Sequence, residues 1–167
     1  MPQTTGYKKT VPDTLLALFK SKLGESIFKA YYMGDPIIIP HSLLPAMIIS
    51  EPATDYDDGP TGFDEIKHNV LIQICFDKRS EFGKKDKEAT LERTIDNIAQ
   101  GRDETTGDYK DISIVGILRR NITLGNLSIR SINGVQKGIV DRSETLTTTE
   151  AHIKITITEL QSVANRV

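Results

Sequence analysis

The sequence predicts an α+β domain in which a mostly antiparallel β-sheet carries two or three helices on one face, with long hairpin and loop extensions. A first observation is the alternation of apolar and polar positions from Glu65 to Asp77, which is the two-residue period of a strand with one buried face. A second is the same alternation from Ala151 to Leu160. A third is the helical spacing of apolar residues before and after the first alternating stretch. This order of elements favours an antiparallel sheet with helices on one side.

The first element is a helix that opens at Pro12 and Asp13. Its apolar residues recur every three or four positions, namely Val11, Leu15, Leu18, Phe19, Leu23, Ile27 and Phe28. We expect the helix to end between Tyr31 and Gly34. Glycine readily adopts the left-handed conformation of a helix C-terminus, and Pro36 cannot continue a helix.

Apolar stretches that favour strands follow the first helix. Ile37 to Ile39 lies between two prolines, which favours an edge strand or an extended segment. Leu43 to Glu51 is predicted to be the first full strand, and Pro52 to Asp64 a long acidic hairpin. In the central strand that comes next, the positions expected on the core side are Ile66, His68, Val70, Ile72, Ile74 and Phe76.

The middle of the chain is predicted to be helical. A charged connector from Lys78 to Glu88 leads into a helix that ends by Gly101. The apolar stripe of this helix is Ala89, Leu91, Ile95 and Ile98. Residues 102–111 form a polar loop. Ile112 to Asn121 fits a short third helix or, because of its β-branched residues, a strand; we favour the helix.

The end of the chain is rich in predicted strands. Leu127 to Ile132 and Val135 to Leu146 are separated by Asn133-Gly134, which favours a two-residue turn. The last predicted strand, Ala151 to Leu160, has three isoleucines on one side and polar side chains on the other. The polar positions are His152, Lys154, Thr156 and Thr158.

Composition narrows the classes of function. The chain has 21 basic and 23 acidic residues and a formal net charge of -2, which disfavours a dedicated nucleic-acid binder. Cys75 is the only cysteine, so the sequence excludes an intrachain disulfide and a cysteine metal cluster. No apolar run of signal-peptide length follows Lys8 and Lys9, and no segment approaches about 18 consecutive apolar residues. We therefore expect a soluble intracellular protein without membrane contact.

Candidate chemical sites are few. The carboxylates between Asp55 and Glu65 do not fit an EF-hand calcium loop, since the sixth position counted from Asp55 is Pro60 and not glycine. The histidines are not spaced as zinc ligands, and Cys75 has no adjacent basic residue that would activate its thiol. The sequence has no glycine-rich phosphate-binding motif. We expect no metal, no cofactor and no catalytic residue.

Polar extensions are the most distinctive feature. We divide the chain into an N-terminal arm (1–10), a single α+β domain (11–160) and a C-terminal tail (161–167). The polar stretches 52–64 and 101–111 are long for such a domain, and long loops of this kind are commonly functional. With the connector, they supply the residues expected in partner contacts: Asp55, Asp57, Asp58, Asp64, Lys84, Lys85, Arg102, Asp103 and Glu104. A subunit that interlocks with copies of itself would have such extensions.

Six features occur in a fixed order along the chain. They are the amphipathic first helix, the run Leu43-Leu44-Pro45-Ala46-Met47-Ile48-Ile49, the long hairpin, the alternating stretch Ile66 to Phe76, the helix after a charged connector, and the closing Glu150-Ala151-His152-Ile153-Lys154-Ile155-Thr156-Ile157. In this order they resemble the tail terminator (tail completion) proteins of long-tailed bacteriophages, which are small α+β proteins of the phage neck. The resemblance covers roughly residues 11–160 and contains no signature motif.

The resemblance implies a virion structural protein that forms a ring, typically of six subunits. Such a ring caps the tail tube, stops its polymerisation and joins the tail to the head-completion or connector protein. Sheets of neighbouring subunits would line a channel through which double-stranded DNA passes without sequence-specific binding, with the helices outside. The expected contact elements are the hairpin Asp55 to Asp64, the loop Arg102 to Asp111, the arm Gln3 to Lys9 and the tail Gln161 to Val167. The protein would assemble in the host cytoplasm and reside in the virion neck.

Two alternatives stay open at this point. Within the same class, a head-completion or connector protein or a tail tube subunit has a similar pattern of elements. From a different class, a small ligand-binding domain or enzyme would use His68, His152 and the acidic hairpin. That alternative requires both imidazoles to point into one pocket with Asp55 or Asp57.

Overall fold

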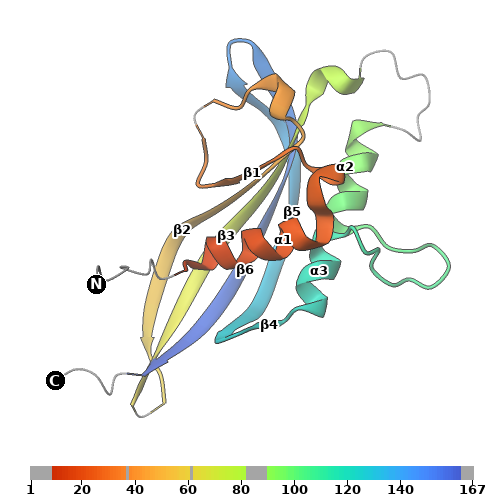
Figure 1. Ribbon diagram of the computed structural model, residues 1–167. Helices are drawn as coiled ribbons and strands as arrows, with labels where there is room; N and C mark the ends of the chain where they lie inside the picture. Colours follow the sequence, from red (N-terminus) through yellow and green to blue (C-terminus); the bar gives the residue numbers. More distant parts are fainter. Residues whose placement is uncertain (1–8, 37, 61, 82–89, 163–167) are drawn as a thin grey trace, which may run out of the picture.

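Six strands form a single sheet in the computed structural model, which describes residues 9–36, 38–60, 62–81 and 90–162. The strand order is β1-β2-β3-β6-β5-β4, and all neighbours are antiparallel except β1 and β2. The three helices pack on one side of the twisted sheet (Figure 1). The elements are α1 (Val11–Ile27), β1 (Ala30–Met33), β2 (Ala46–Asp58), β3 (Phe63–Asp77), α2 (Leu91–Gln100), α3 (Ile114–Arg120), β4 (Thr123–Leu124), β5 (Leu127–Ser143) and β6 (Leu146–Ser162). The predicted α+β fold is confirmed.

The pair β3 and β6 forms the centre of the sheet. The two strands are in register from Phe63 opposite Ser162 to Asp77 opposite Thr148. The predicted alternation is confirmed, because the even-numbered side chains of β3 from Val70 to Phe76 join the core beneath the helices. Cys75, on the opposite face, belongs to a second cluster. Residues far apart in sequence are therefore fixed in one central ladder.

The main core lies between the helices and the sheet. Fully buried side chains come from each helix, with Leu15 and Phe19 in α1, Ile95 in α2 and Ile117 in α3, and they meet the central isoleucines of the sheet. The stretch that fitted either a helix or a strand is α3, and the hydroxyl of Ser113 caps it by accepting the N–H of Gly116 at 3.2 Å. The third helix that we favoured is therefore confirmed.

The first helix ends earlier than predicted. Gly24 has a positive φ of 60°, which interrupts the helical backbone near its end, and α1 stops at Ile27. The predicted end between Tyr31 and Gly34 is wrong, since β1 occupies that stretch and pairs in parallel with β2. The Tyr31 hydroxyl donates to the Gly24 carbonyl at 2.7 Å, which ties the kink to the edge of the sheet.

Two strand boundaries also differ from the prediction. The strand expected at Leu43 starts at Ala46 and continues as far as Asp58, so most of the expected acidic hairpin is regular β-structure. Ile38 and Ile39 belong to no strand, and Ile37 lies outside the described residues. The hairpin itself is confirmed, with the chain reversing between β2 and β3.

Asn133-Gly134 is a β-bulge, and the prediction of a turn there is wrong. Ile132 stands opposite Ile155 and Val135 opposite Ile153, so two residues of β5 face one residue of β6. The bulge keeps Ile132 and Val135 on the helix side, where both pack against the core. The chain reverses later, between Ser143 and Leu146.

Two regions of the sheet extend beyond the helical layer. The first is the outer part of β2, β3 and β6, which continues past α1 as a three-stranded ribbon (Figure 1). We call residues 53–58, 63–67 and 158–161 the distal ribbon. The second is the polar part of the face opposite the helices, which we call the open face. Its polar side chains include Asn69, Arg130, Gln136, Lys154 and Thr156, and Leu71 lies among them. In the part of the chain that the structure describes, no helix is both long and apolar enough to cross a membrane.

Candidate functional site

The distal ribbon brings together the four predicted acidic residues of the hairpin. Asp55 accepts a hydrogen bond from Asn69 Nδ2 at 2.8 Å, and Asp57 forms an ion pair with Lys67. These are cross-strand pairs that hold β2 against β3. Asp58 is exposed and next to the turn, and it stands opposite Asp64 in the ladder. The acidic residues therefore gather at one end of the molecule, on both faces of the ribbon.

Exposed apolar side chains accompany these carboxylates. Tyr56 is 71% exposed, Phe63 44% and Leu160 51%, although each lies within a strand. Single exposed apolar residues are common, but three at the end of one narrow ribbon are suited to contact with a partner. The sequence analysis missed them. The sequence feature that could have revealed them is an aromatic or aliphatic residue within the polar outer part of a strand.

The loop 101–111 forms a second projection, well away from the distal ribbon (Figure 1). The Asp103 carboxylate accepts the backbone N–H groups of Thr106 and Thr105, both at 2.9 Å, and these bonds lower the pKa of Asp103. The Arg102 guanidinium lies 3.9 Å from the centre of the Tyr109 ring. These local contacts give the exposed loop a defined conformation.

The predicted contact residues therefore do not form one site. Arg102, Asp103 and Glu104 are exposed on the loop, apart from the acidic residues of the distal ribbon. Lys84 and Lys85 lie outside the described residues. The structure places two separate projections on one rigid sheet and its helices.

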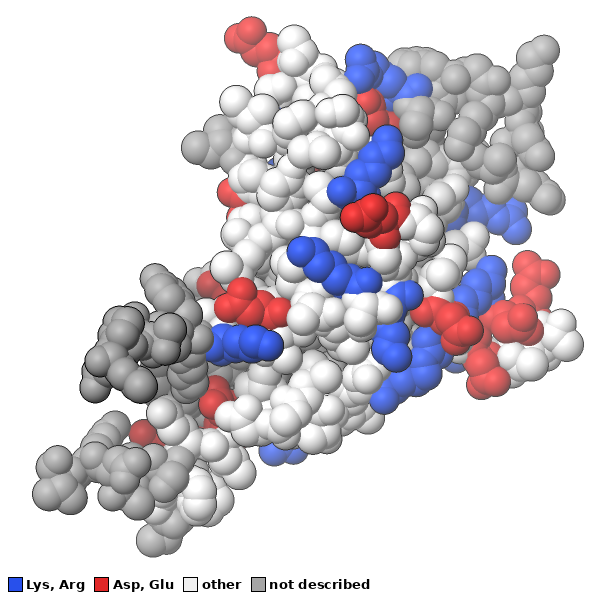
Figure 2. Space-filling model, viewed as in Figure 1, with Lys and Arg blue, Asp and Glu red and all other residues white. Residues whose placement is uncertain are grey.

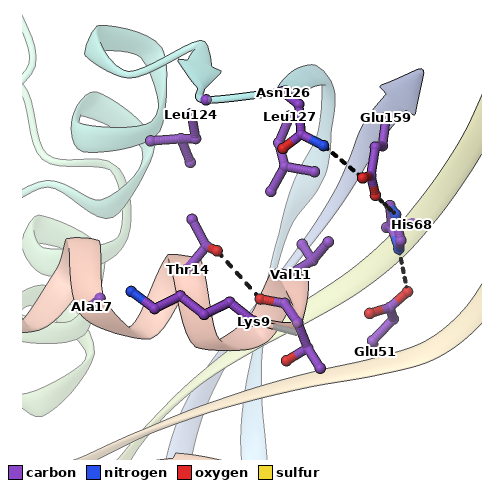
Figure 3. Close-up of a pocket in the computed structure, with 12 residues that line it drawn as sticks. Lys9, Val11, Thr14, Ala17, Glu51, His68, Leu124, Asn126, Leu127 and Glu159 are labelled. Atoms are coloured by element: carbon purple, nitrogen blue, oxygen red, sulfur yellow. Dashed lines mark hydrogen bonds and ion pairs between the residues drawn. The ribbon is translucent and has the colours of Figure 1, made fainter. Parts of the chain in front are cut away.

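His68 lies in a cleft of about 790 Å³ between the start of α1, the β4–β5 turn and the sheet (Figure 3). Its Nδ1 is 2.5 Å from Glu51 Oε1, and its Nε2 is 3.4 Å from Glu159 Oε2. Asn126 Nδ2 donates to Glu159 Oε1 at 2.6 Å, and the Thr54 hydroxyl donates to Glu51 Oε1 at 2.6 Å. The chain of contacts joins β2, β3, β6 and the β4–β5 turn.

This cluster is largely buried, with the side chains of His68, Glu51 and Glu159 exposed by 12%, 17% and 9%. A protonated imidazole would donate one N–H to each carboxylate. Buried charges of this kind are stable only when they are paired. The arrangement is suited to locking three strands together. The sequence feature that could have revealed this cluster is Glu159. It lies two positions after Ile157 in the last alternating strand, and so on the side that faces the core.

His152 lies on the opposite face of the sheet. His68 stands opposite Ile157 and points toward the helices, whereas His152 stands opposite Gln73 on the other side. Asp55 and Asp57 are also on that other side, at the distal end of the sheet. The hypothesis of a pocket shared by the two histidines and the acidic hairpin is therefore wrong.

His152 belongs to a buried ionic network around Glu150. The Glu150 side chain is 1% exposed and accepts hydrogen bonds from Arg142 Nε at 2.5 Å, the Thr148 hydroxyl at 2.6 Å and His152 Nε2 at 2.7 Å. Burial raises the pKa of Glu150, but these bonds outweigh it and hold the pKa at about 2. Arg142 also donates to Asp35 at 2.8 Å, which ties the β5–β6 end of the sheet to the segment after β1.

Cys75 lies beside this network. Burial and the Glu150 charge raise the pKa of its thiol, and an Arg142 nitrogen 3.5 Å away opposes that shift only partly. The thiol stays protonated and inert at neutral pH. Among the described residues, no group of three His, Cys, Asp or Glu side chains is placed to hold a metal ion.

Comparison of the chain with protein-family models and with curated proteins gave no match.

Proposed function

We propose that this protein is a structural subunit of the neck of a tailed bacteriophage, where it acts as a ring-forming tail terminator. The ring caps the tail tube, stops its polymerisation and joins the tail to the head-completion or connector protein. DNA passes through its lumen. The function is geometric, since each subunit supplies surfaces for its neighbours and for the rings above and below.

The observation that carries this proposal is the combination of the distal ribbon with the open face. Helices cover one side of the sheet. The ribbon continues past them, and the polar face lies on the opposite side of the sheet (Figure 1). A subunit of a ring needs one surface for the lumen, surfaces on its flanks for neighbours, and an end that reaches the next ring. The helical layer, the open face and the two projections supply distinct surfaces for these tasks.

The edges of the sheet also favour assembly. β1 pairs only with Ala46–Ile49 of β2, and β4 pairs only with the first two residues of β5. Within the described residues, the outer edges of β2 beyond Ser50 and of β5 beyond Ile129 have no partner strand. Unpaired edges invite contacts with another chain. Neighbouring subunits in a ring would cover both.

The charge of the open face suits a channel for DNA. Lys154 and Arg130 are exposed on this face, and on the same side of the distal ribbon Lys67 pairs with Asp57 beside Asp55 and Glu65, so the face presents no continuous basic surface. Neutralising many phosphates would hold DNA tightly. A balanced polar surface lets the duplex slide.

The test is the mass of the purified protein by light scattering, followed by negative-stain imaging and a tube-growth assay. We expect a closed ring of about six subunits that limits tube length when added to polymerising tube protein. A chain that polymerises alone into tubes would identify a tube subunit and contradict the proposal. A protein that stays monomeric, also in the presence of tube ends, would contradict it as well.

A further inference from the structure

The tip of the distal ribbon carries apolar groups on both of its faces. Tyr56 stands opposite Ile66 on the helix side, whereas Phe63 and Leu160 lie on the open side. Asp57 and Asp58 lie beside them at the turn. We call residues 55–58, 63–65 and 160 the tip surface. It has five carboxylates and no basic residue, together with three exposed apolar side chains.

A second surface on the same chain has the opposite character. A hollow between α1 and α3 is lined by Lys22, Asp111, Ile117, Arg120 and Asn121. Arg119 is exposed beside it, and Ile112 and Ile122, at the two ends of α3, are 37% and 51% exposed. We call these eight residues the α1–α3 groove. Figure 2 shows basic side chains distributed over this helix-covered side of the molecule.

Two of the three cations of the groove are available for a partner. Within the part of the chain that the structure describes, the side chains of Lys22 and Arg119 have no hydrogen-bond or ion-pair partner. Arg120 is anchored, because it donates to the carbonyl oxygens of Tyr109 and Lys110 at 3.1 and 3.2 Å and lies 3.8 Å from the carboxylate of Asp111. Its position at the groove is therefore defined, while Lys22 and Arg119 remain free to meet carboxylates.

We propose that the tip surface of one copy docks into the α1–α3 groove of a second copy. The groove has three cations, one carboxylate and flanking isoleucines, and it matches an end that combines five carboxylates with Tyr56 and Phe63. Complementary charge of this kind selects partners and their orientation. The two surfaces lie in different parts of the chain (Figure 1), so the contact is head-to-tail and a pair of copies keeps one free tip surface and one free groove. The inference rests on the proposed function for its partner, since a ring requires such a heterologous contact.

Cysteine pairs test this contact directly. The native Cys75 is buried with a raised thiol pKa, so it gives little background. A chain with Asp58→Cys is mixed with a chain with Arg119→Cys and treated with a short bis-maleimide. We expect cross-linked dimers, and a ladder that ends at the ring size when both changes are in one chain. Arg93→Cys is the matched control, because Arg93 is an exposed arginine on α2, outside the groove.

Charge reversal tests the energetics of the same contact. Asp58→Lys alone and Arg119→Asp alone should each weaken self-association about five- to tenfold, because like charges then face each other. The double variant should recover most of the loss. Recovery would not occur if the two residues acted separately.

The outcomes separate the two proposals. Rings in negative stain without cross-links between positions 58 and 119 would overturn the docking inference and leave the neck function standing. Cross-linked chains that never close and never limit tube growth would support the docking and overturn the neck function. Cross-linking by Arg93→Cys as efficient as by Arg119→Cys, or a double variant as weak as the singles, would also overturn the docking inference.

Discussion

Glu150, at the centre of the buried ionic network, causes part of the pH dependence of the protein's stability. Its pKa is about 2 in the folded protein, against an ordinary value of 4.5. A carboxyl whose folded pKa is depressed stabilises the protein above its unfolded pKa, and that contribution is lost as the pH falls toward the folded pKa. The difference corresponds to about 3 kcal/mol of unfolding free energy.

We therefore predict that Glu150→Gln removes an acid-sensitive contribution. Between pH 5 and pH 2, the stability gap between the native sequence and the variant should shrink by about 3 kcal/mol, as measured by urea unfolding at low protein concentration. The low pKa of Asp77, held down chiefly by hydrogen bonds from Arg79, contributes equally to both proteins and cancels. A gap that is constant across this range would show that Glu150 does not carry the effect.

His68 should be the more costly histidine to replace. In His68→Ala, Glu51 and Glu159 lose the imidazole between them, and we expect a loss of about 2–4 kcal/mol in unfolding free energy. His41→Ala is the control. His41 pairs with Asp77 at 3.1 Å, but its side chain is 37% exposed and Asp77 keeps Arg79 as a partner, so the loss should stay below about 1 kcal/mol. Equal losses would contradict the locking role of His68.

The sequence predicts where His68 points but not what it binds. Alternation places it on the core side of β3, and the structure agrees. Its carboxylate partners are 17 and 91 positions away, and only the pairing of β2 and β6 with β3 brings them together. Contacts that depend on strand register have no local signature in one sequence.

At the scale of elements, the strands that the sequence predicts well are those with one face buried in the core. β3 and β6 are predictable because each alternates over a long stretch with one side in the core. Asn133-Gly134 misleads because a hairpin turn and a bulge both use a glycine at positive φ, here 118°. The long β6 decides between them, since it pairs with β5 on both sides of the bulge.

The protein should fold without the end of the distal ribbon. We predict that replacing residues 57–65 by Asn-Gly, which joins Tyr56 to its ladder partner Ile66 through a two-residue turn, leaves a folded monomer. The removed residues lie outside the main core, so the unfolding free energy should change by less than about 1 kcal/mol. Ring formation should be lost, as measured by light scattering.

Two readouts keep that experiment decisive. Circular dichroism and urea unfolding report whether the shortened chain is folded, independently of assembly. Asp57→Asn in the full-length ribbon is the matched control, because it keeps the length of the hairpin and removes one carboxylate of the tip. Rings formed by the shortened protein would contradict a role of the ribbon in assembly.

At the scale of the whole molecule, the two faces of the sheet are predicted to differ in their exposure to solvent after assembly. The helical layer lies outside the proposed ring and the open face lines its lumen. Lys154 is exposed on the open face, and Arg93 is exposed on the helical layer in α2, outside the α1–α3 groove. A cysteine at either position reports which surface the ring encloses.

We predict that a bulky polyethylene-glycol maleimide labels Lys154→Cys in the monomer but much more slowly in the preformed ring, and that labelled monomers fail to close. Arg93→Cys should react at the same rate in both states, because this part of α2 lies outside the α1–α3 groove and stays in solvent. A crowded lumen excludes a large polymer tag, whereas a small maleimide should still react with both sites and report that each thiol is accessible. Equal protection of the two positions would mean that assembly buries α2 as well. Protection of Arg93→Cys alone would place the helices, and not the open face, toward the lumen.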